Sequence, residues 1–107
     1  MITTKLIFDR RKTASRTREG YVEVRVTIDR MTKYISTGVR VYKNEWAADR
    51  VVNREDAQAL NDRLAIIFEK VYQAATESVK QSVKLDVESV KQAVWQFVES
   101  QSDEPTF

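Results

Sequence analysis

Residues 20–29 read Gly-Tyr-Val-Glu-Val-Arg-Val-Thr-Ile-Asp, and this stretch decides the fold. Every second side chain is aliphatic, namely Val22, Val24, Val26 and Ile28. Strict alternation with β-branched side chains predicts a β-strand that is buried on one face only. The aliphatic face must be covered by a second layer. The outward face carries Tyr21, Glu23, Arg25, Thr27 and Asp29.

Two shorter segments flank this strand and favour a small sheet. Large apolar side chains fall on one face of a strand at about residues 4–9, and residues 33–37 read as a third strand ended by Gly38. Residues 30–32 join the second and third strands, and such short connections favour an antiparallel meander. A weaker pattern at residues 48–52 predicts a further short strand or turn.

The second half of the chain follows the helical period. We expect a long amphipathic helix over residues 54–82, with Asn53 as its N-cap. Its stripe is Leu60, Leu64, Ile67, Phe68, Val71, Tyr72 and Ala75. A second helix starts at the N-cap Asp86, with the stripe Val87, Val90, Val94, Phe97 and Val98, and we expect the tail 99–107 to be frayed. The predicted fold class is α+β: a three-stranded antiparallel β-sheet packed on a long α-helix, followed by a second helix.

Composition excludes most classes of enzyme. The chain has 107 residues with no cysteine, no histidine and two glycines. These absences exclude Ser-His and Cys-His nucleophiles, zinc sites built from Cys or His, and glycine-rich phosphate loops. We therefore expect a non-catalytic chain with no cofactor and no metal. No run of about 18 apolar residues occurs, so we expect no membrane span, and the lack of cysteine suits a cytoplasmic protein.

The charges are segregated along the chain. Residues 1–43 hold eleven basic and four acidic side chains, a net charge of +7, whereas the remaining 64 residues carry −5. A basic block of this kind is typical of a protein that binds a polyanion. The bases between the first two strands are assigned to phosphates: Arg10, Arg11, Lys12, Arg16 and Arg18. Arg30 and Lys33, at the second turn, are expected to flank the same surface.

The outward face of the sheet is the candidate base-reading surface. Its expected members are Tyr21, Arg25 and Thr27 on the central strand, with Tyr34 or Ser36 beside them. A narrow sheet can enter a major groove about 12 Å wide, where an arginine grips guanine and hydroxyls reach phosphates or base edges. Glu23, on the same face, accepts from cytosine or pairs with Arg25 in this interpretation. The predicted partner is double-stranded DNA.

Three short motifs carry a resemblance to a known family. They are Tyr21–Ile28, the run Ile35-Ser36-Thr37-Gly38-Val39-Arg40-Val41, and Glu45-Trp46, followed by Ala59-Leu60-Asn61-x-x-Leu64 in the long helix. In this order they resemble the N-terminal arm-type DNA-binding domain of tyrosine recombinases, the integrases of conjugative or mobilisable transposons. One departure is the turn at residues 29–32, where the family often has a glycine. It leaves the register of the second hairpin open.

The resemblance implies a place in DNA integration and recombination. Residues 1–80 would form the arm-type domain, with the sheet at 4–41 and the long helix at 54–82, and residues 83–107 a helical linker toward a missing core-binding domain. Other recombinase subunits would be partners. The family's catalytic domain uses a histidine, which this chain lacks, so the implied role is arm-site binding without catalysis.

Two alternatives stay open from the sequence. The helices could serve a protein-interaction module in which the basic sheet edge binds an acidic partner. The second alternative is an RNA-binding sheet, on which the bases of a single strand would stack on Tyr21 and Tyr34. The apolar stripes of the two helices extend past a small sheet, which fits either a helical hairpin on one chain or a surface that another chain or domain covers.

Overall fold

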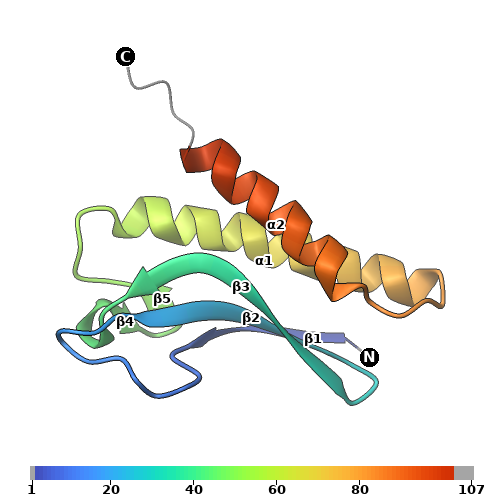
Figure 1. Cartoon of the computed structure of the whole chain (residues 1–107), viewed down its shortest axis with the longest axis horizontal. Coiled ribbons are helices and arrows are strands. Elements are labelled where there is room, and N and C mark those ends of the chain that lie inside the picture. The colour runs from blue at the N-terminus through green and yellow to red at the C-terminus, as the bar shows by residue number, and fades with distance from the viewer. Residues whose placement is uncertain (1, 103–107) are drawn as a thin grey trace.

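The computed structural model describes residues 2–102, with side-chain environments defined up to residue 96. Its centre is an antiparallel sheet in the order β1 (Ile2–Phe8), β2 (Gly20–Ile28) and β3 (Met31–Val41) (Figure 1). The long helix α1 (Ala57–Lys80) lies across one face, and α2 (Val87–Ser102) follows it. The α+β fold predicted from the sequence is thus confirmed. β1 starts two residues earlier than expected, and β3 continues four residues further.

The alternation in β2 sets the two faces of the sheet. Val22, Val24 and Val26 are at most 1 % exposed. Val24 is paired with Leu6 of β1 on one side and with Ile35 of β3 on the other. These side chains face α1 and form the core, whereas the intervening residues face away from it.

A two-residue turn joins β2 to β3. Ile28 pairs with Met31, so only Asp29 and Arg30 form the connection, not the three-residue link 30–32 that the sequence suggested. Their φ angles are 48° and 71°, and positive φ at both central residues is the mark of a type I′ hairpin turn. Asp tolerates the left-handed region better than most residues. The turn therefore forms without a glycine and fixes the register of the hairpin.

A bulge interrupts β3 opposite Val22. Tyr21 pairs with Arg40 and Glu23 with Ser36, which leaves residues 37–39 facing one residue of β2. The prediction that Gly38 ends the strand is wrong: Gly38 takes a φ of 79° inside the bulge, and the strand resumes after it. The Thr37 hydroxyl donates to the Val22 carbonyl at 2.8 Å and accepts from the Val39 N–H at 3.2 Å. This buried hydroxyl thereby replaces the ladder bonds that the bulge removes.

Replacing Thr37 by valine is expected to lower the free energy of unfolding by about 1–3 kcal/mol, because two buried backbone groups lose their partner. Urea denaturation measures this loss. The same change at Thr3, an exposed position on β1, serves as the control and should shift stability by less than about 0.5 kcal/mol. Equal effects at both positions would show that the Thr37 hydroxyl does not support the bulge.

One side of α1 completes the core. Leu64, Ile67, Val71 and Ala75 are buried against the sheet, as the stripe predicted. Tyr72 was predicted to join them but is 42 % exposed, because it lies at the side of the stripe, away from the line through the buried Val71 and Ala75.

The start of α1 differs from the prediction. Asn53 has a φ of 59°, and its amide donates to the Asn44 carbonyl at 2.8 Å, so it does not cap the helix. The N-cap is Asp56, whose carboxylate accepts from Arg54 at 2.6 and 3.1 Å. That hydrogen-bonded ion pair lowers the pKa of Asp56 below its ordinary value. The helix consequently begins three residues later than expected.

A small hairpin connects β3 to α1. After the short 3₁₀ turn η1 (Lys43–Glu45), β4 (Trp46–Ala47) pairs with β5 (Arg50–Val51). This confirms the short strand or turn expected at residues 48–52. Asn61 of α1 accepts from the Val51 N–H at 2.8 Å and donates to the Val51 carbonyl at 3.0 Å. The Trp46 ring stacks on Phe8 at 5.5 Å. These contacts tie the hairpin to α1 and to β1.

The second helix returns over β3 and α1. Asp86 caps it as predicted, accepting from the Glu88 and Ser89 N–H groups at 3.1 and 3.4 Å, and the Ser89 hydrogen bonds lower the pKa of Asp86. Val90 and Val94 are buried in the core, so the two helices pack as a hairpin on one chain.

Part of the predicted second stripe and tail is not described. The structure does not describe the side chains of Phe97 and Val98. Residues 103–107 of the predicted tail lie outside the described residues altogether. Residues 99–102, expected to belong to a frayed tail, instead form the last turn of α2. No helix in the described part of the chain is long and apolar enough to cross a membrane.

Candidate nucleic-acid interface

The sheet face turned away from α1, called here the outer face, gathers the polar side chains of all three strands. Its composition follows from the strand register. Its members are Thr3, Lys5 and Ile7 of β1, Tyr21, Glu23, Arg25 and Thr27 of β2, and Thr32, Tyr34, Ser36 and Arg40 of β3. In Figure 1 both helices lie on the other side of the sheet. The outer face is thus the open side of the molecule.

Five residues predicted as the base-reading surface share this face. They are Tyr21, Arg25, Thr27, Tyr34 and Ser36. Arg25 lies at the centre, opposite Lys5 on one side and Tyr34 on the other. The Thr27 and Thr32 hydroxyls lie 3.1 Å apart. The structure therefore resolves the open register of the second hairpin: Tyr34 and Ser36 both lie beside β2 on the outer face.

Two cations of the outer face were missed as site residues. Lys5 pairs with Arg25, and the Arg40 guanidinium lies 5.9 Å from the centre of the Tyr21 ring. Alternation in β1 could have placed Lys5, because its neighbour Leu6 faces inward. Arg40 was hidden by the assumption that the strand stops at Gly38.

The loop between β1 and β2 is organised by Asp9. Its carboxylate accepts from the Thr13 and Ala14 N–H groups, both at 2.9 Å. A Cβ added at Gly20 would meet Ala14 Cβ at 2.8 Å, so only glycine lets the loop pack this closely on β2. Further along, the Lys43 N–H donates to the Ser15 carbonyl at 3.1 Å. The β1–β2 loop held in this way carries four exposed cations: Arg11, Lys12, Arg16 and Arg18.

Arg10 differs from the other loop cations because it folds back onto the outer face. Its Nε and Nη2 donate to the two carboxylate oxygens of Glu23 at 3.0 and 3.3 Å. Its Cζ lies 4.0 Å from the centre of the Tyr34 ring. The hydrogen bond to Glu23 raises the pKa of Arg10. Glu23 thus pairs with Arg10. The pair with Arg25, one of the two roles that the sequence suggested for Glu23, is not formed.

A hollow of about 250 Å³ opens beside this ion pair, between the loop and the sheet. Its lining combines acceptors, donors and an aromatic ring: Asp9, Arg10, Arg11, Thr13, Tyr21, Glu23 and Ser36. The loop and the outer face therefore form one continuous surface.

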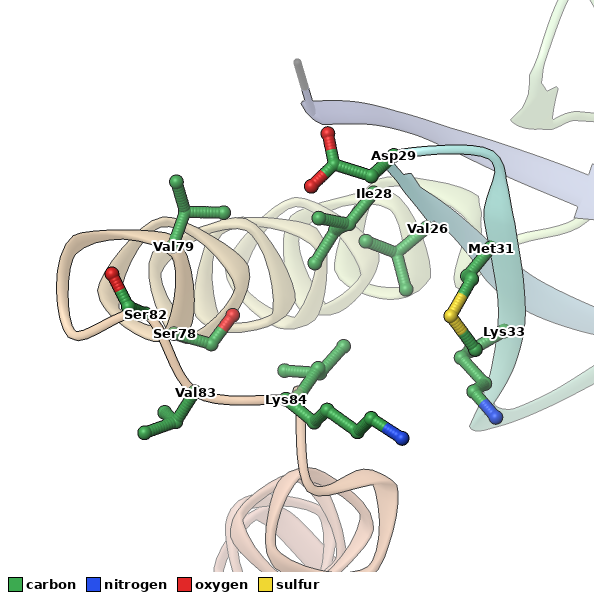
Figure 2. Close-up of a pocket in the computed structure, with 11 residues that line it drawn as sticks. Val26, Ile28, Asp29, Met31, Lys33, Ser78, Val79, Ser82, Val83 and Lys84 are labelled. Carbon is green, nitrogen blue, oxygen red and sulfur yellow. The ribbon is translucent and has the colours of Figure 1, made fainter.

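The structure separates Lys33 from the outer face. Lys33 pairs with Val26, a core residue, and so projects to the helix side of the sheet. It lines a hollow of about 510 Å³ between the β2–β3 hairpin and the α1–α2 connection. Figure 2 shows Met31 and Lys33 beside this hollow, across from Val83 and Lys84. Lys33 therefore does not flank the predicted surface, whereas Arg30 lies exposed in the turn itself.

A three-stranded sheet with one helix-covered face and one open face rich in cations is compatible with a protein that reads nucleic acid with strands. Residues 10–91 match the family described as the Arm DNA-binding domain, and the chain belongs to this family. Its partner is DNA. The match starts within the β1–β2 loop and ends in α2. Neither a curated protein nor a solved structure matches the chain.

Proposed function

We propose that this chain is the arm-site-binding module of a tyrosine recombinase, an integrase of a conjugative or mobilisable transposon. The proposal rests on the Arm DNA-binding family together with the open, cation-rich outer face. The sequence motifs on β2, β3 and α1 supply the recombinase context. In that role the chain holds accessory DNA sites while another domain cuts and rejoins strands during DNA integration. A protein-interaction module is not favoured by the family.

In the proposed complex the sheet lies in the major groove of duplex DNA. Three strands at roughly 4.8 Å spacing are about 10 Å across, which fits a groove about 12 Å wide. Arg25 at the centre of the sheet contacts a base edge. The exposed cations Arg11, Lys12, Arg16 and Arg18 contact phosphates beside the groove. Tyr21, Thr27, Tyr34 and Ser36 supply further hydrogen bonds, and Arg30 lies at the far end.

The domain organisation is part of the same proposal. Residues 1–80 act as the arm-type domain, and residues 83–107 link it toward a core-binding domain. Within that linker, Val90 and Val94 of α2 are buried against the arm domain. Such packing would fix the direction in which the next domain leaves. Other recombinase subunits are the proposed protein partners.

Fluorescence anisotropy with labelled DNA tests the DNA-binding mode. We expect duplex DNA to bind more tightly than single-stranded DNA or duplex RNA, with an affinity that falls steeply with salt. Titrations begin at low salt, because a single module binds arbitrary sequence only in the range of roughly 10⁻⁴–10⁻⁶ M. Equal affinity for single strands would contradict insertion of the sheet into a groove.

Footprinting tests the recombinase context separately. The element that carries the gene supplies the DNA, and its two ends are the segments to examine. We expect the chain to protect repeated DNA sequences that lie within the element, near its ends but at a distance from the point of strand exchange. Protection confined to the exchange point would contradict an arm-site role while leaving DNA binding intact.

Replacing Arg25 by alanine is expected to weaken binding to a selected duplex by about 1–3 kcal/mol and to relax the preference at one base pair. Anisotropy on that duplex and on single-base variants measures both effects. Arg63→Ala on α1, on the other side of the sheet, provides the control. An Arg25→Ala variant that binds the selected duplex like the wild type would rule out the sheet-in-groove arrangement.

A further inference from the structure

Arg10 belongs to a loop by sequence but to the outer face by position. The Nε and Nη2 atoms of Arg10 donate hydrogen bonds to the Glu23 carboxylate at 3.0 and 3.3 Å, and the Arg10 Cζ lies 4.0 Å from the centre of the Tyr34 ring. The side-chain exposed fractions are 39 % for Arg10 and 18 % for Glu23. The guanidinium therefore covers the carboxylate and is more accessible than Glu23 to a ligand on this face.

The geometry leaves the far edge of the guanidinium for a ligand. Of the five N–H donors of arginine, two are directed to Glu23. Three donors remain, two on Nη1 and one on Nη2, and the Nη2 donor forms a parallel pair with one of those on Nη1. Such a pair matches two neighbouring acceptors, and in the major groove guanine presents O6 and N7 in this arrangement. Adenine and cytosine instead place an amino donor there, and thymine offers one acceptor.

The ion pair also argues against a simple phosphate contact. Arg10 and Glu23 together carry no net charge, so the pair gains little from the polyanionic backbone compared with the unpaired loop arginines. Its advantage is that the side chain is already held in one orientation, which reduces the entropy lost on binding. A group held in this way discriminates between base edges better than it adds general affinity.

We propose that Arg10 reads a guanine in the major groove, and that Glu23 and Tyr34 are positioning residues that hold its guanidinium. This inference rests on the proposed function, because it requires the outer face to lie in the groove. It assigns to Arg10 a role different from the phosphate contact expected from the sequence. It also predicts a guanine in the recognised site besides any that Arg25 contacts.

The test uses duplexes selected from a random library with the wild-type chain. Each guanine of the selected site is replaced in turn by 7-deazaguanine, which lacks the N7 acceptor, and affinity is measured by anisotropy at one salt concentration. We expect one position at which the replacement weakens the wild type and Arg25→Ala alike but leaves Arg10→Ala unchanged. At that position Arg10→Ala should lose the preference for guanine by roughly 5- to 150-fold.

Two further variants distinguish reading from general affinity. Arg10→Lys keeps the charge but not the parallel donors, so it should lose the guanine preference as alanine does. Glu23→Gln removes a negative charge near DNA, so it should keep or raise binding to arbitrary duplex while reducing the preference at the same guanine. A merely structural role of Glu23 would instead lower both affinities together.

The outcomes separate this inference from the proposed function. If Arg10→Ala lowers the salt slope by about one unit and changes no base preference, Arg10 contacts phosphate and the inference fails, although DNA binding stands. The same holds if every 7-deazaguanine position weakens Arg10→Ala as much as the wild type. If the wild-type chain binds no duplex at low salt, both proposals fail.

Discussion

Replacing Arg11, Arg16 and Arg18 together by glutamine is expected to lower duplex affinity on the order of a hundredfold at about 0.1 M salt. The three side chains are exposed on the β1–β2 loop. Each lost phosphate contact reduces the slope of log affinity against log salt by about 0.9, so the slope should fall by about 2.7. The loss should be uniform across DNA sequences, because phosphates carry no base information. Anisotropy titrations at several salt concentrations measure both quantities.

A variant of equal charge provides the control for that experiment. Three exposed lysines lie away from the outer face. Lys33 projects to the helix side of the sheet, Lys80 ends α1, and Lys84 lies in the α1–α2 connection. Changing all three to glutamine removes the same charge from the other side of the molecule and should leave the slope nearly unchanged. If both variants lose affinity equally, net charge governs binding and the loop has no special place in the interface.

Replacing Ile67 by alanine is expected to lower the free energy of unfolding by about 2–5 kcal/mol. Ile67 is 0 % exposed and lies among the aliphatic side chains of β2, β3 and α2. The truncation leaves a cavity where all these layers meet. A small domain has a total stability of only about 5–15 kcal/mol, so the variant would approach its unfolding threshold. Urea denaturation followed by circular dichroism measures the change.

The neighbouring residue offers the matched control. Ile66 has the same side chain on the same helix but is 45 % exposed. Ile66→Ala should change the free energy of unfolding by less than about 0.5 kcal/mol, and alanine's higher helix propensity offsets part of any loss. Equal losses in the two variants would mean that α1 does not pack on the sheet through the Ile67 side.

The parts of the fold that could be predicted are those governed by short-range periodicity. Alternation in residues 20–29 gave β2 and its buried side, and the spacing of Leu64, Ile67 and Val71 gave the buried side of α1. Asp86 was recognisable as a cap because its carboxylate needs only the next helical turn. Each of these features depends on neighbours within a few residues. The packing of α1 on the sheet follows, because both elements have one apolar side that must be buried.

The features that were missed depend on partners distant in sequence. Asn53 has a cap-forming side chain, but its amide is taken by Asn44. The partner of Glu23 is Arg10, thirteen residues away, and nothing in the alternation of β2 indicates that a loop arginine folds back over it. Lys33 was placed with the basic surface because of its charge, while the hairpin register puts it on the helix side.

The bulge at residues 37–39 has a consequence for how the length of this domain can change. Three residues there stand opposite one, so the chain has gained two residues relative to an unbroken ladder. An even gain keeps the side-chain alternation in phase, so that Arg40 still points outward and Val41 still points into the core. A single-residue insertion at the same place would exchange them and bury the arginine. Related chains should therefore vary in length here in steps of two.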